Sequence, residues 1–580
     1  MSLPEIYIKR LSAGRWACLS AYHPAVVAAV KSFPGSRWDG QCWTFGPDIA
    51  AEILQQAEDD CYPWRHVSYT GESAGPPVPE LCRALNLKDA RDYQELGVGR
   101  ASHDIKERGG FLLADDRGLG KTFQALKVAH LFGAQKVLVI CPAIAKSVWL
   151  DQVDKWLGKA NSLVVLRGLQ PIDMQLAHWQ RTPQITIVNY DILAGRKTSR
   201  KQKAGGFNTS EYSGWADALV AWKPDLLILD EAHAVKNKSA ARTAAVAKIA
   251  AASKARLALT GTPVWNKLLD VFGLMDVLFP GAFGTKFQFA QAYMEPIHNG
   301  YGWEYTGVNK LRLDELQRRL TFYMLSRKKV DVLKELPAKT RVIVPIDGFD
   351  TEISNQDDYD LQQGVRGGGL KWLKSAQGLS AQTTVLHELS RIKAPYTAEQ
   401  VLSVLSDTTH VVVFAHFKEA TKLIAAALNS RVATSVITGD TSDKERVQAQ
   451  QAWEAAERGV LIMTTAAGGV ALNLQRANVV VFNDLEWAPS ALLQAEDRIH
   501  RLGQSLPCTI YYMVARGTVE DAVADSVIAK MDAAERVTGG SDTLMALSEE
   551  QSLADIVAAI TGGYNGGDEW LSDEDEELEE

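Results

Sequence analysis

Cysteine is scarce in this sequence, and long apolar runs are missing. The six cysteines among 580 residues form no Cys-x-x-Cys pair and lie near no pair of histidines at zinc-ligand spacing, which argues against a zinc finger and a disulfide framework. No apolar stretch approaches the roughly 20 residues of a membrane-spanning helix, and the N-terminus lacks a signal-peptide pattern. We therefore expect a cytoplasmic protein with reduced cysteines and no membrane partner.

The chain also lacks a strong excess of charge outside its C-terminus. Its formal net charge is −8, but residues 568–580 hold nine acidic residues and no basic one. The remainder is therefore nearly neutral, and net charge does not decide for or against a nucleic-acid partner. We expect the acidic tail to be disordered and to serve solubility or to imitate DNA. At 580 residues, the sequence is long enough for two or three domains.

Residues 111–122, FLLADDRGLGKT, predict a phosphate-binding loop. An apolar strand breaks into a segment with Gly118, Gly120, Lys121 and Thr122 before a helical pattern resumes. The glycines let the backbone approach an anion, and the following helix presents unpaired N–H groups. Lys121 is the residue type that reaches the β and γ phosphates of ATP, and Thr122 the type that holds Mg²⁺.

Four further residues have the chemistry to complete this site, which matters because Asp115 stands where the usual first glycine is expected. The strand LLILDEA ends in Asp230, which fits a Mg²⁺ ligand, and Glu231, which fits the base that orients the attacking water. We expect Gln94 to read the adenine edge with its amide. Thr260, in the segment LTGTP, is placed to sense the γ-phosphate. In isolation, each of these patterns would be typical of an ordinary loop, turn or surface residue.

Two segments raise the possibility of nucleic-acid contact. Residues 1–70 interleave aromatic side chains with Lys31 and Arg37, and these aromatics either stack on nucleic acid or fill a small core. We expect a helix over 24–33 and a hairpin around residues 39–40. Residues 196–203 hold five basic residues, which we interpret as a loop that contacts phosphates.

Strands and helices alternate over most of the chain, which predicts an α/β fold with parallel sheets covered by helices. A first alternating region includes the phosphate loop, a largely helical region follows, and a second alternating region begins near residue 401. This second region has no phosphate loop of its own, so it would serve the nucleotide of the first or another ligand. Its segment SALLQAEDRIHRLGQ predicts a helix over 490–504.

Six motifs in order carry a family resemblance: DDRGLGKT, LILDEAHAVKN, ALTGTPVWN, LSRKKVDVLKELPAKT, TTAAGGVALNLQRANVVVFNDLEWAPS and QAEDRIHRLGQ. Over residues 90–539 the chain resembles the SWI/SNF-type ATPases of helicase superfamily two. QAEDRIHRLGQ, ITGDTSDKER and the N-terminal aromatic segment are most similar to the annealing-helicase (HepA-related) branch, and the N-terminal segment is similar to that branch's HARP domain.

The resemblance implies two RecA-like lobes that clamp ATP, with duplex DNA bound across both. It implies that Arg498 and Arg501 are arginine fingers, and that Gln494, Gly468 and Gly469 line the same cleft. The domain boundaries that we expect are a HARP-like domain at 1–70, lobe 1 at 71–280, helical insertions and a connector at 281–400, lobe 2 at 401–540 and the acidic tail at 541–580.

The function that we expect is ATP-dependent translocation on double-stranded or forked DNA, with Mg²⁺ as the metal and with annealing or remodelling at forks or bubbles. Two alternatives stay open: a strand-separating helicase, and an ATP-gated remodeller of a DNA-bound protein such as RNA polymerase. We expect a monomer associated with the nucleoid of a bacterial or phage-infected cell.

The basic segment at residues 196–203 generates the first prediction. Replacing its five basic residues by glutamine should make the dependence of DNA affinity on salt shallower, because each lost phosphate contact reduces the slope of log K against log salt by about 0.9. Titration of labelled duplex at several salt concentrations measures this slope. An unchanged slope would rule the contact out.

Overall fold

The computed structural model describes residues 6–536 except for 13–14, 21–23, 40–41, 59–66, 71–86, 88, 144, 159–162, 169–170, 172–184, 202–206, 236, 238–239, 262–267, 299–302, 307–308, 348–353, 374, 466–471, 473 and 487–488. The chain forms two compact units, which divide between Lys334 and Glu335. This division falls inside the predicted connector 281–400, and the acidic tail lies outside the described residues. None of the helices in the described part combines the length and apolarity of a membrane crossing.

Unit 1 begins with a small α+β subdomain. Its sheet has the order β3-β4-β2-β1-β5, in which only the β1–β5 pair is parallel. The elements are β1 (Ile6–Ser12), β2 (Arg15–Ser20), α1 (Pro24–Ser32), β3 (Arg37–Trp38), β4 (Trp43–Phe45), α2 (Pro47–Glu58) and β5 (Val67–Thr70). The helix and the hairpin predicted for this region are thereby confirmed.

The aromatic side chains of this subdomain divide between core and surface. Trp16, Phe33 and Phe45 pack with the apolar side chains of α1 and α2 and are almost fully buried. Trp38, in contrast, is 56% exposed and lies beside Trp43. Among the aromatic side chains that the structure describes, Trp16, Phe33 and Phe45 therefore build the core, as one of the two interpretations requires, and Trp38 is exposed to an external partner.

The main body of unit 1 is a seven-stranded, fully parallel sheet of order β16-β6-β13-β12-β7-β9-β8. Its strands are β6 (Gly110–Leu113), β7 (Val137–Cys141), β8 (Leu163–Val165), β9 (Ile185–Asn189), β12 (Leu226–Leu229), β13 (Ala255–Leu259) and β16 (Met324–Leu325). Both faces are buried, as expected for continuous apolar strands. Alternate residues of β6 point to opposite cores, with Phe111 and Leu113 in one and Leu112 in the other.

Helices cover both faces of this sheet. One face packs against α3 (Asp92–Arg108), α4 (Lys121–Phe132) and α5 (Ala145–Leu157). The other packs against α7 (Ala216–Trp222), α8 (Ala241–Ala252), α9 (Leu268–Leu278), α10 (Lys286–Tyr293) and α11 (Leu313–Thr321). A small hairpin, β14 (Glu295–His298) with β15 (Trp303–Thr306), and the short helix α12 (Lys329–Val332) complete the unit.

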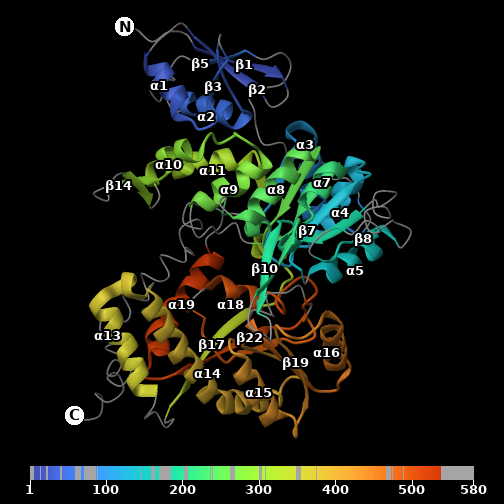
Figure 1. Ribbon diagram of the computed structural model, residues 1–580, viewed down its shortest axis with the longest axis vertical. Coiled ribbons are helices and arrows are strands. Elements are labelled where there is room, and N and C mark those ends of the chain that lie inside the picture. Colours follow the sequence, from blue (N-terminus) through green and yellow to red (C-terminus); the bar gives the residue numbers. More distant parts are fainter. Residues whose placement is uncertain are drawn as a thin grey trace, which may run out of the picture. The chain divides into compact units, whose positions relative to one another are not determined.

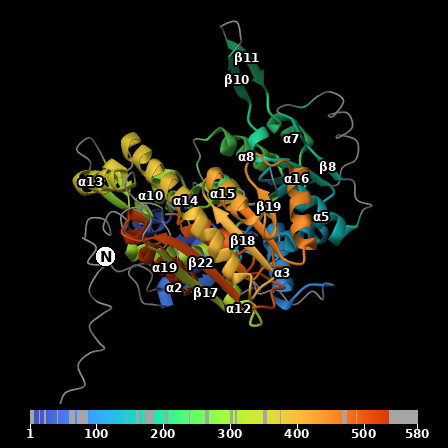
Figure 2. The same cartoon turned by 90° about the horizontal axis from the view of Figure 1, so that it is seen from below.

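The basic segment predicted as a loop is instead a strand. Residues Arg196–Lys201 form β10, which pairs residue for residue with β11 (Phe207–Tyr212) in an antiparallel hairpin. The prediction of a loop was wrong because the pairing partner follows the basic run directly in sequence, and cross-strand hydrogen bonds satisfy the backbone of both segments. Figure 2 shows this hairpin standing away from the rest of unit 1. The predicted phosphate contact stays a prediction.

Unit 2 contains a six-stranded parallel sheet of order β17-β22-β21-β18-β20-β19. Its strands are β17 (Lys339–Ile346), β18 (His410–Ala415), β19 (Ala433–Ile437), β20 (Gly459–Thr464), β21 (Val479–Phe482) and β22 (Cys508–Ala515). Its helices are α13 (Ser354–Leu373), α14 (Ala376–Val404), α15 (Lys418–Leu428), α16 (Asp443–Ala455), α18 (Pro489–Glu496) and α19 (Val519–Arg536). The second α/β region is therefore confirmed, and the first strand of its sheet comes from the predicted connector.

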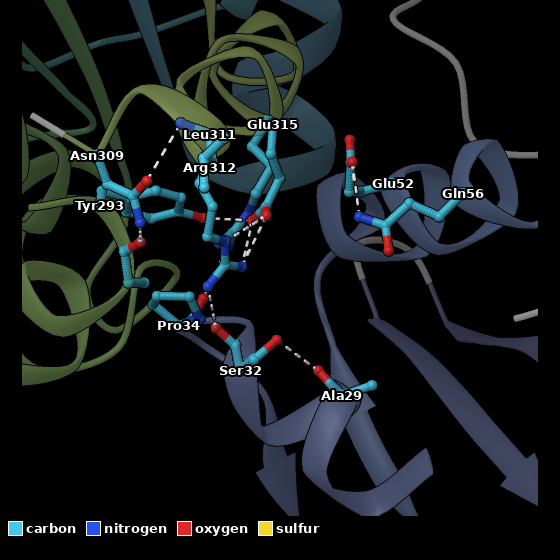
Figure 3. A network of polar contacts seen from close by, with 12 residues as sticks. Ala29, Ser32, Pro34, Glu52, Gln56, Tyr293, Asn309, Leu311, Arg312 and Glu315 are labelled. Carbon is cyan, nitrogen blue, oxygen red and sulfur yellow. Dashed lines mark hydrogen bonds and ion pairs between the residues drawn. The ribbon is translucent and has the colours of Figure 1, made fainter. Parts of the chain in front are cut away.

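The N-terminal subdomain is fixed to α11 by buried polar contacts. Arg319 is fully buried, and its Nε lies 2.7 Å from Asp48 Oδ2, while the Tyr323 hydroxyl donates to the other oxygen of Asp48 over 2.5 Å. Arg312 donates to Glu315 over 2.8 Å and to the carbonyl of Ser32 over 3.2 Å, as Figure 3 shows. Figure 1 shows the subdomain (blue) beside α11.

The buried ion pair between Asp48 and Arg319 predicts that the stability of this subdomain depends strongly on its contact with α11. Arg319→Met should lower the free energy of unfolding by about 3 to 5 kcal/mol, because it leaves a buried carboxylate without its cation. Arg318→Met is the matched control, since Arg318 is half exposed in its pair with Glu52 and should contribute at most about 1 kcal/mol. Urea unfolding followed by tryptophan fluorescence compares the two, and equal losses would contradict the assignment.

Candidate nucleotide site

The predicted phosphate loop lies at the carboxyl edge of the unit 1 sheet, between β6 and α4. Gly118 and Gly120 have φ angles of +86° and +77°, which favour glycine. A Cβ at Gly120 would lie 2.4 Å from Gln94 Nε2, so a side chain there would displace the Gln94 amide. Lys121 begins α4, and its Nζ lies 2.7 Å from the carbonyl oxygen of Asp115. A glycine loop, a helix N-terminus and a lysine thus meet at one place, as a polyphosphate site requires.

Asp115, the residue that departs from the usual loop pattern, is a fully buried anchor. Arg327 Nε donates to its Oδ1 over 2.8 Å, and Gln124 Nε2 donates to its Oδ2 over 3.1 Å. Arg327 comes from the segment after β16, which pairs with β6. The main-chain N–H of Asp116 also donates to the carbonyl of Arg327 over 2.9 Å. The segment that follows β16 therefore holds one side of the phosphate loop through an ion pair and a main-chain hydrogen bond.

Asp230 and Glu231 follow β12, at the same edge of the sheet. Asp230 Oδ2 accepts from Trp149 Nε1 over 2.8 Å, and its Oδ1 accepts from the Glu231 N–H over 3.0 Å. Burial, followed by the charge of Glu231, raises the pKa of Asp230 to about 6. A cation at this carboxylate would offset both effects, so its environment fits a Mg²⁺ ligand.

Glu231 has an uncommon backbone conformation. Its φ is +48°, in the left-handed region that residues other than glycine seldom adopt. The carboxylate is about a quarter exposed and lies 3.4 Å from Nδ1 of His233. Such a conformation lowers the stability of the fold by on the order of 1 kcal/mol or more, and residues with this conformation are found mainly at functional positions. The position of this strain, directly after Asp230, agrees with the role predicted for Glu231.

The structure also locates the remaining predicted residues of unit 1. Thr122 is half-buried in the first turn of α4, and Thr260 is buried, its N–H donating to the Leu113 carbonyl over 3.1 Å. Gln94 donates from Nε2 to the carbonyl of Leu119 over 3.1 Å, and its Oε1 accepts from the Arg91 N–H. The amide of Gln94 therefore supports the phosphate loop here, and its predicted role with adenine stays a prediction.

In unit 2, the helix that contains Gln494 is shorter than predicted. It ends at Glu496, so Arg498 and Arg501 lie in the turns after it, and the prediction of a helix over 490–504 is wrong for residues 497–504. After Glu496 the N–H groups of Arg498 and Ile499 donate to carbonyls three residues back, over 3.1 Å each, so the backbone leaves the α-helical pattern. Glu496 itself is fully buried and bound from outside the helix. Lys339 and Arg341 contact its carboxylate at 2.6 to 2.7 Å, and the Tyr512 hydroxyl donates to it over 2.6 Å.

Glu496 thus fixes the start of the segment that carries both arginines. The carbonyl of Arg498 accepts from the Leu474 N–H over 3.3 Å. Burial lowers the pKa of Arg501, and the charge of Asp497 opposes this shift. Gly468 and Gly469 lie outside the described residues. Sequence reasoning did not single out Glu496 or Arg327, although each stands in a motif that was recognised.

In unit 1 the residues fit ATP with Mg²⁺. The glycine loop and Lys121 suit the phosphates, Thr122 and Asp230 are oxygen ligands of the kind that Mg²⁺ prefers, and Glu231 suits a water. These groups follow β6 and β12, which lie on either side of β13 in one parallel sheet. They stand at the carboxyl edge of this sheet, where ligands bind in open α/β folds. When bound, the metal would supply charge to polarise the phosphoryl group.

The Glu496 cluster predicts a defined acid sensitivity. Burial alone would raise the pKa of Glu496, but Lys339 and Arg341 overcome it and lower the pKa from 4.5 to about 2. A carboxyl with a depressed pKa stabilises the fold above its unfolded pKa, and this contribution is lost as pH falls from 4.5 towards 2. Glu496→Gln should therefore lower the unfolding free energy at neutral pH by about 3 kcal/mol.

Chemical unfolding from neutral pH down to acid measures this effect, and the loss caused by Glu496→Gln should shrink as the pH falls. Glu388→Gln is the control, because Glu388 pairs with Arg391 on the partly exposed surface of α14 and should contribute about 0.5 kcal/mol. A loss for Glu496→Gln that is as small as that of the control would contradict the role of the cluster.

Comparison with known proteins gives two family matches. Residues 82–354 match the SNF2-related domain, and residues 397–503 match the helicase conserved C-terminal domain. A solved structure, the Sulfolobus solfataricus SWI2/SNF2 ATPase core in complex with dsDNA, is 21% identical and covers 81% of this chain and 99% of its own, with a TM-score of 0.38.

Curated relatives align with most of the chain. The SWI/SNF-related matrix-associated actin-dependent regulator of chromatin subfamily A-like protein 1 of Xenopus laevis is 28% identical over 74% of this chain, and its Bos taurus counterpart is 30% identical over 88%. The human DNA annealing helicase and endonuclease ZRANB3 is 26% identical over 76%. The chain spans 42%, 53% and 39% of these three relatives.

These matches agree with the geometry of the site. The SNF2-related match contains the latched phosphate loop and the strained Glu231, and the helicase C-terminal match ends just beyond Arg501. The chain belongs to the SWI/SNF-type, helicase-like ATPases of superfamily two.

Proposed function

We propose that the protein hydrolyses ATP with Mg²⁺ and uses the cycle to move along double-stranded DNA, rewinding strands at forks or bubbles. The observation that carries the ATPase assignment is the placement of the strained Glu231 beside Asp230, at the sheet edge that also holds the phosphate loop. Support for rewinding comes from relatives named as annealing helicases and from the HARP-like N-terminal subdomain.

The residues of unit 1 divide the chemistry between them. Asp230 and Thr122 hold the metal, and Lys121 neutralises charge on the β and γ phosphates. Glu231 orients the attacking water and accepts its proton. Thr260 senses whether the γ-phosphate is present. On the family resemblance, Arg498 and Arg501 stabilise charge on the transferring phosphoryl group, which would couple hydrolysis to opening and closing of the two lobes.

The DNA contacts of such a motor are mostly to the backbone. Phosphate contacts fix register without reading sequence, so we expect weak sequence preference and strong salt dependence. We further propose that the protein acts as a monomer, in the cytoplasm and on the nucleoid. Two other readings of the same ATPase remain: a strand-separating helicase and a remodeller of a DNA-bound protein such as RNA polymerase.

The decisive experiment is ATP hydrolysis without nucleic acid and with single-stranded, duplex and forked DNA. Duplex or fork should stimulate hydrolysis, and Lys121→Ala and Glu231→Gln should each reduce the stimulated rate by about 100-fold or more, because they remove phosphate neutralisation and the base. Lys254→Ala is the control, since Lys254 is exposed at the opposite edge of the same sheet.

A rate that no DNA raises would refute a DNA-driven motor and favour gating by a protein partner. Three further assays with the same wild-type and variant proteins then distinguish the possible modes of action. Rewinding of a protein-stabilised bubble supports annealing, release of a labelled strand supports strand separation, and release of a labelled DNA-bound protein supports remodelling.

A further inference from the structure

A cavity of unit 1 lies at the opposite edge of the sheet from the phosphate loop. Its volume is about 410 Å³, and it is lined by the N-terminal subdomain and by the main body of the unit. The main-body residues stand at the start of β13 and the end of α3, which is the amino edge of the parallel sheet. The nucleotide site occupies the carboxyl edge, so the two sites are distinct.

The charged side chains around this cavity are mostly basic. Four arginines and one glutamate line it: Arg15, Arg37, Arg108, Arg256 and Glu107. Strand register places Arg37 beside Thr44, and Thr44 beside Ala17, so the alternation of strands puts Arg15 and Arg37 on the face of the small sheet that points away from α1 and α2.

These arginines are only partly neutralised. Arg256 is half-buried and donates to the carbonyls of Ala250 and Leu278 over 2.7 and 3.0 Å, and it makes no ion pair within the part of the chain that the structure describes. Burial lowers the pKa of Arg256, which is the cost of a cation without an anion. Arg37 also pairs with no described carboxylate, and Arg15 lies 3.5 Å from Asp39.

The nearby buried acids are already occupied. Asp48 is bound by Arg319 and Tyr323. Asp104 accepts from both Arg100 and Arg108 over 2.6 Å, so this cluster of three residues retains one positive charge. Glu107 is exposed on the last turn of α3. The cavity therefore has an excess of positive charge that the described residues do not balance.

Two glycines, Gly35 and Gly281, allow the walls of the cavity to approach each other closely. A Cβ at Gly35 would lie 1.9 Å from the carbonyl oxygen of Ala282, and a Cβ at Gly281 would lie 2.1 Å from an Nη atom of Arg37. Both glycines have positive φ angles. The backbones of the subdomain and the main body thus approach closely at Gly35, and the Arg37 guanidinium lies against Gly281.

We propose that this cavity binds a phosphodiester segment of a DNA strand, with the exposed Arg15 and Arg37 as its main ligands and Arg256 in its wall. Its volume lies in the range of about 300 to 1,000 Å³ typical of small-molecule sites, which exceeds the need of a bare phosphate and suits a nucleotide unit of the strand. Arginine forks match phosphate geometry. The choice of DNA as the source of the phosphate group rests on the proposed function. The proposal gives the N-terminal subdomain a defined contact with the DNA strand.

The test is equilibrium binding of a labelled forked DNA without ATP, so that it reads out even if hydrolysis does not depend on DNA. Arg15→Glu with Arg37→Glu should weaken binding by about tenfold and reduce the salt slope by about 2, because two phosphate contacts are lost. Both arginines are exposed, so these changes leave the fold intact. Lys248→Glu with Lys286→Glu, an equal charge change on exposed residues of unit 1 outside the cavity, is the control.

Weakening that is confined to the cavity variant supports the proposal. Equal weakening by both variants would show a general charge effect and overturn it, as would no weakening by either. Calorimetric titration with thymidine monophosphate and with inorganic phosphate tests the other source of the same chemistry. If these bind the wild type and not the cavity variant while forked DNA binds both equally, the ligand is a free phosphate and the assignment to DNA fails.

Discussion

The buried ion pair between Asp115 and Arg327 is the interaction on which the nucleotide site depends. It joins the start of the phosphate loop to a segment that lies 212 positions later in the sequence. An isolated carboxylate at this depth would be strongly disfavoured, and removing either partner of such a pair typically costs about 3 to 5 kcal/mol. The loop can therefore keep its conformation with an aspartate in place of a glycine. The pairing of β16 with β6 places the guanidinium of Arg327 where its charge and its planar donors face Asp115.

The same physical solution recurs at two other places. Asp48 is held by Arg319 where the N-terminal subdomain meets α11, and Glu496 is held by Lys339 and Arg341 where α18 ends. In each case a buried carboxylate joins segments that are distant in sequence. Such pairs add little net stability compared with apolar packing, but a misplaced partner is expensive, so they fix one arrangement against alternatives. The phosphate loop, the subdomain and the segment with Arg498 are positioned in this way.

Much of the fold followed from local pattern, and so did part of the site. The position of Lys121 was predictable because a strand, a glycine turn and a helix follow one another within a few residues. The positions of Asp230 and Glu231 were predictable because both directly follow an apolar strand. The partners of Asp115 and Glu496 were not, since an ion pair across more than 150 positions leaves no periodic signal. The end of α18 was mispredicted for the same reason, because apolar spacing continued past Glu496 while its charge was bound elsewhere. The hairpin at β10 was missed because its basic residues resemble a solvated loop.

On the proposed function, the backbone conformation of Glu231 serves hydrolysis and lowers the stability of the fold at the same position. Glycine or asparagine would occupy a φ of +48° with less strain, so either residue would make the folded chain more stable than glutamate does. A lineage that kept the fold but no longer needed hydrolysis would be expected to drift towards these residues. Persistence of glutamate there would in turn record that selection acts on the rate of the reaction and accepts a less stable protein.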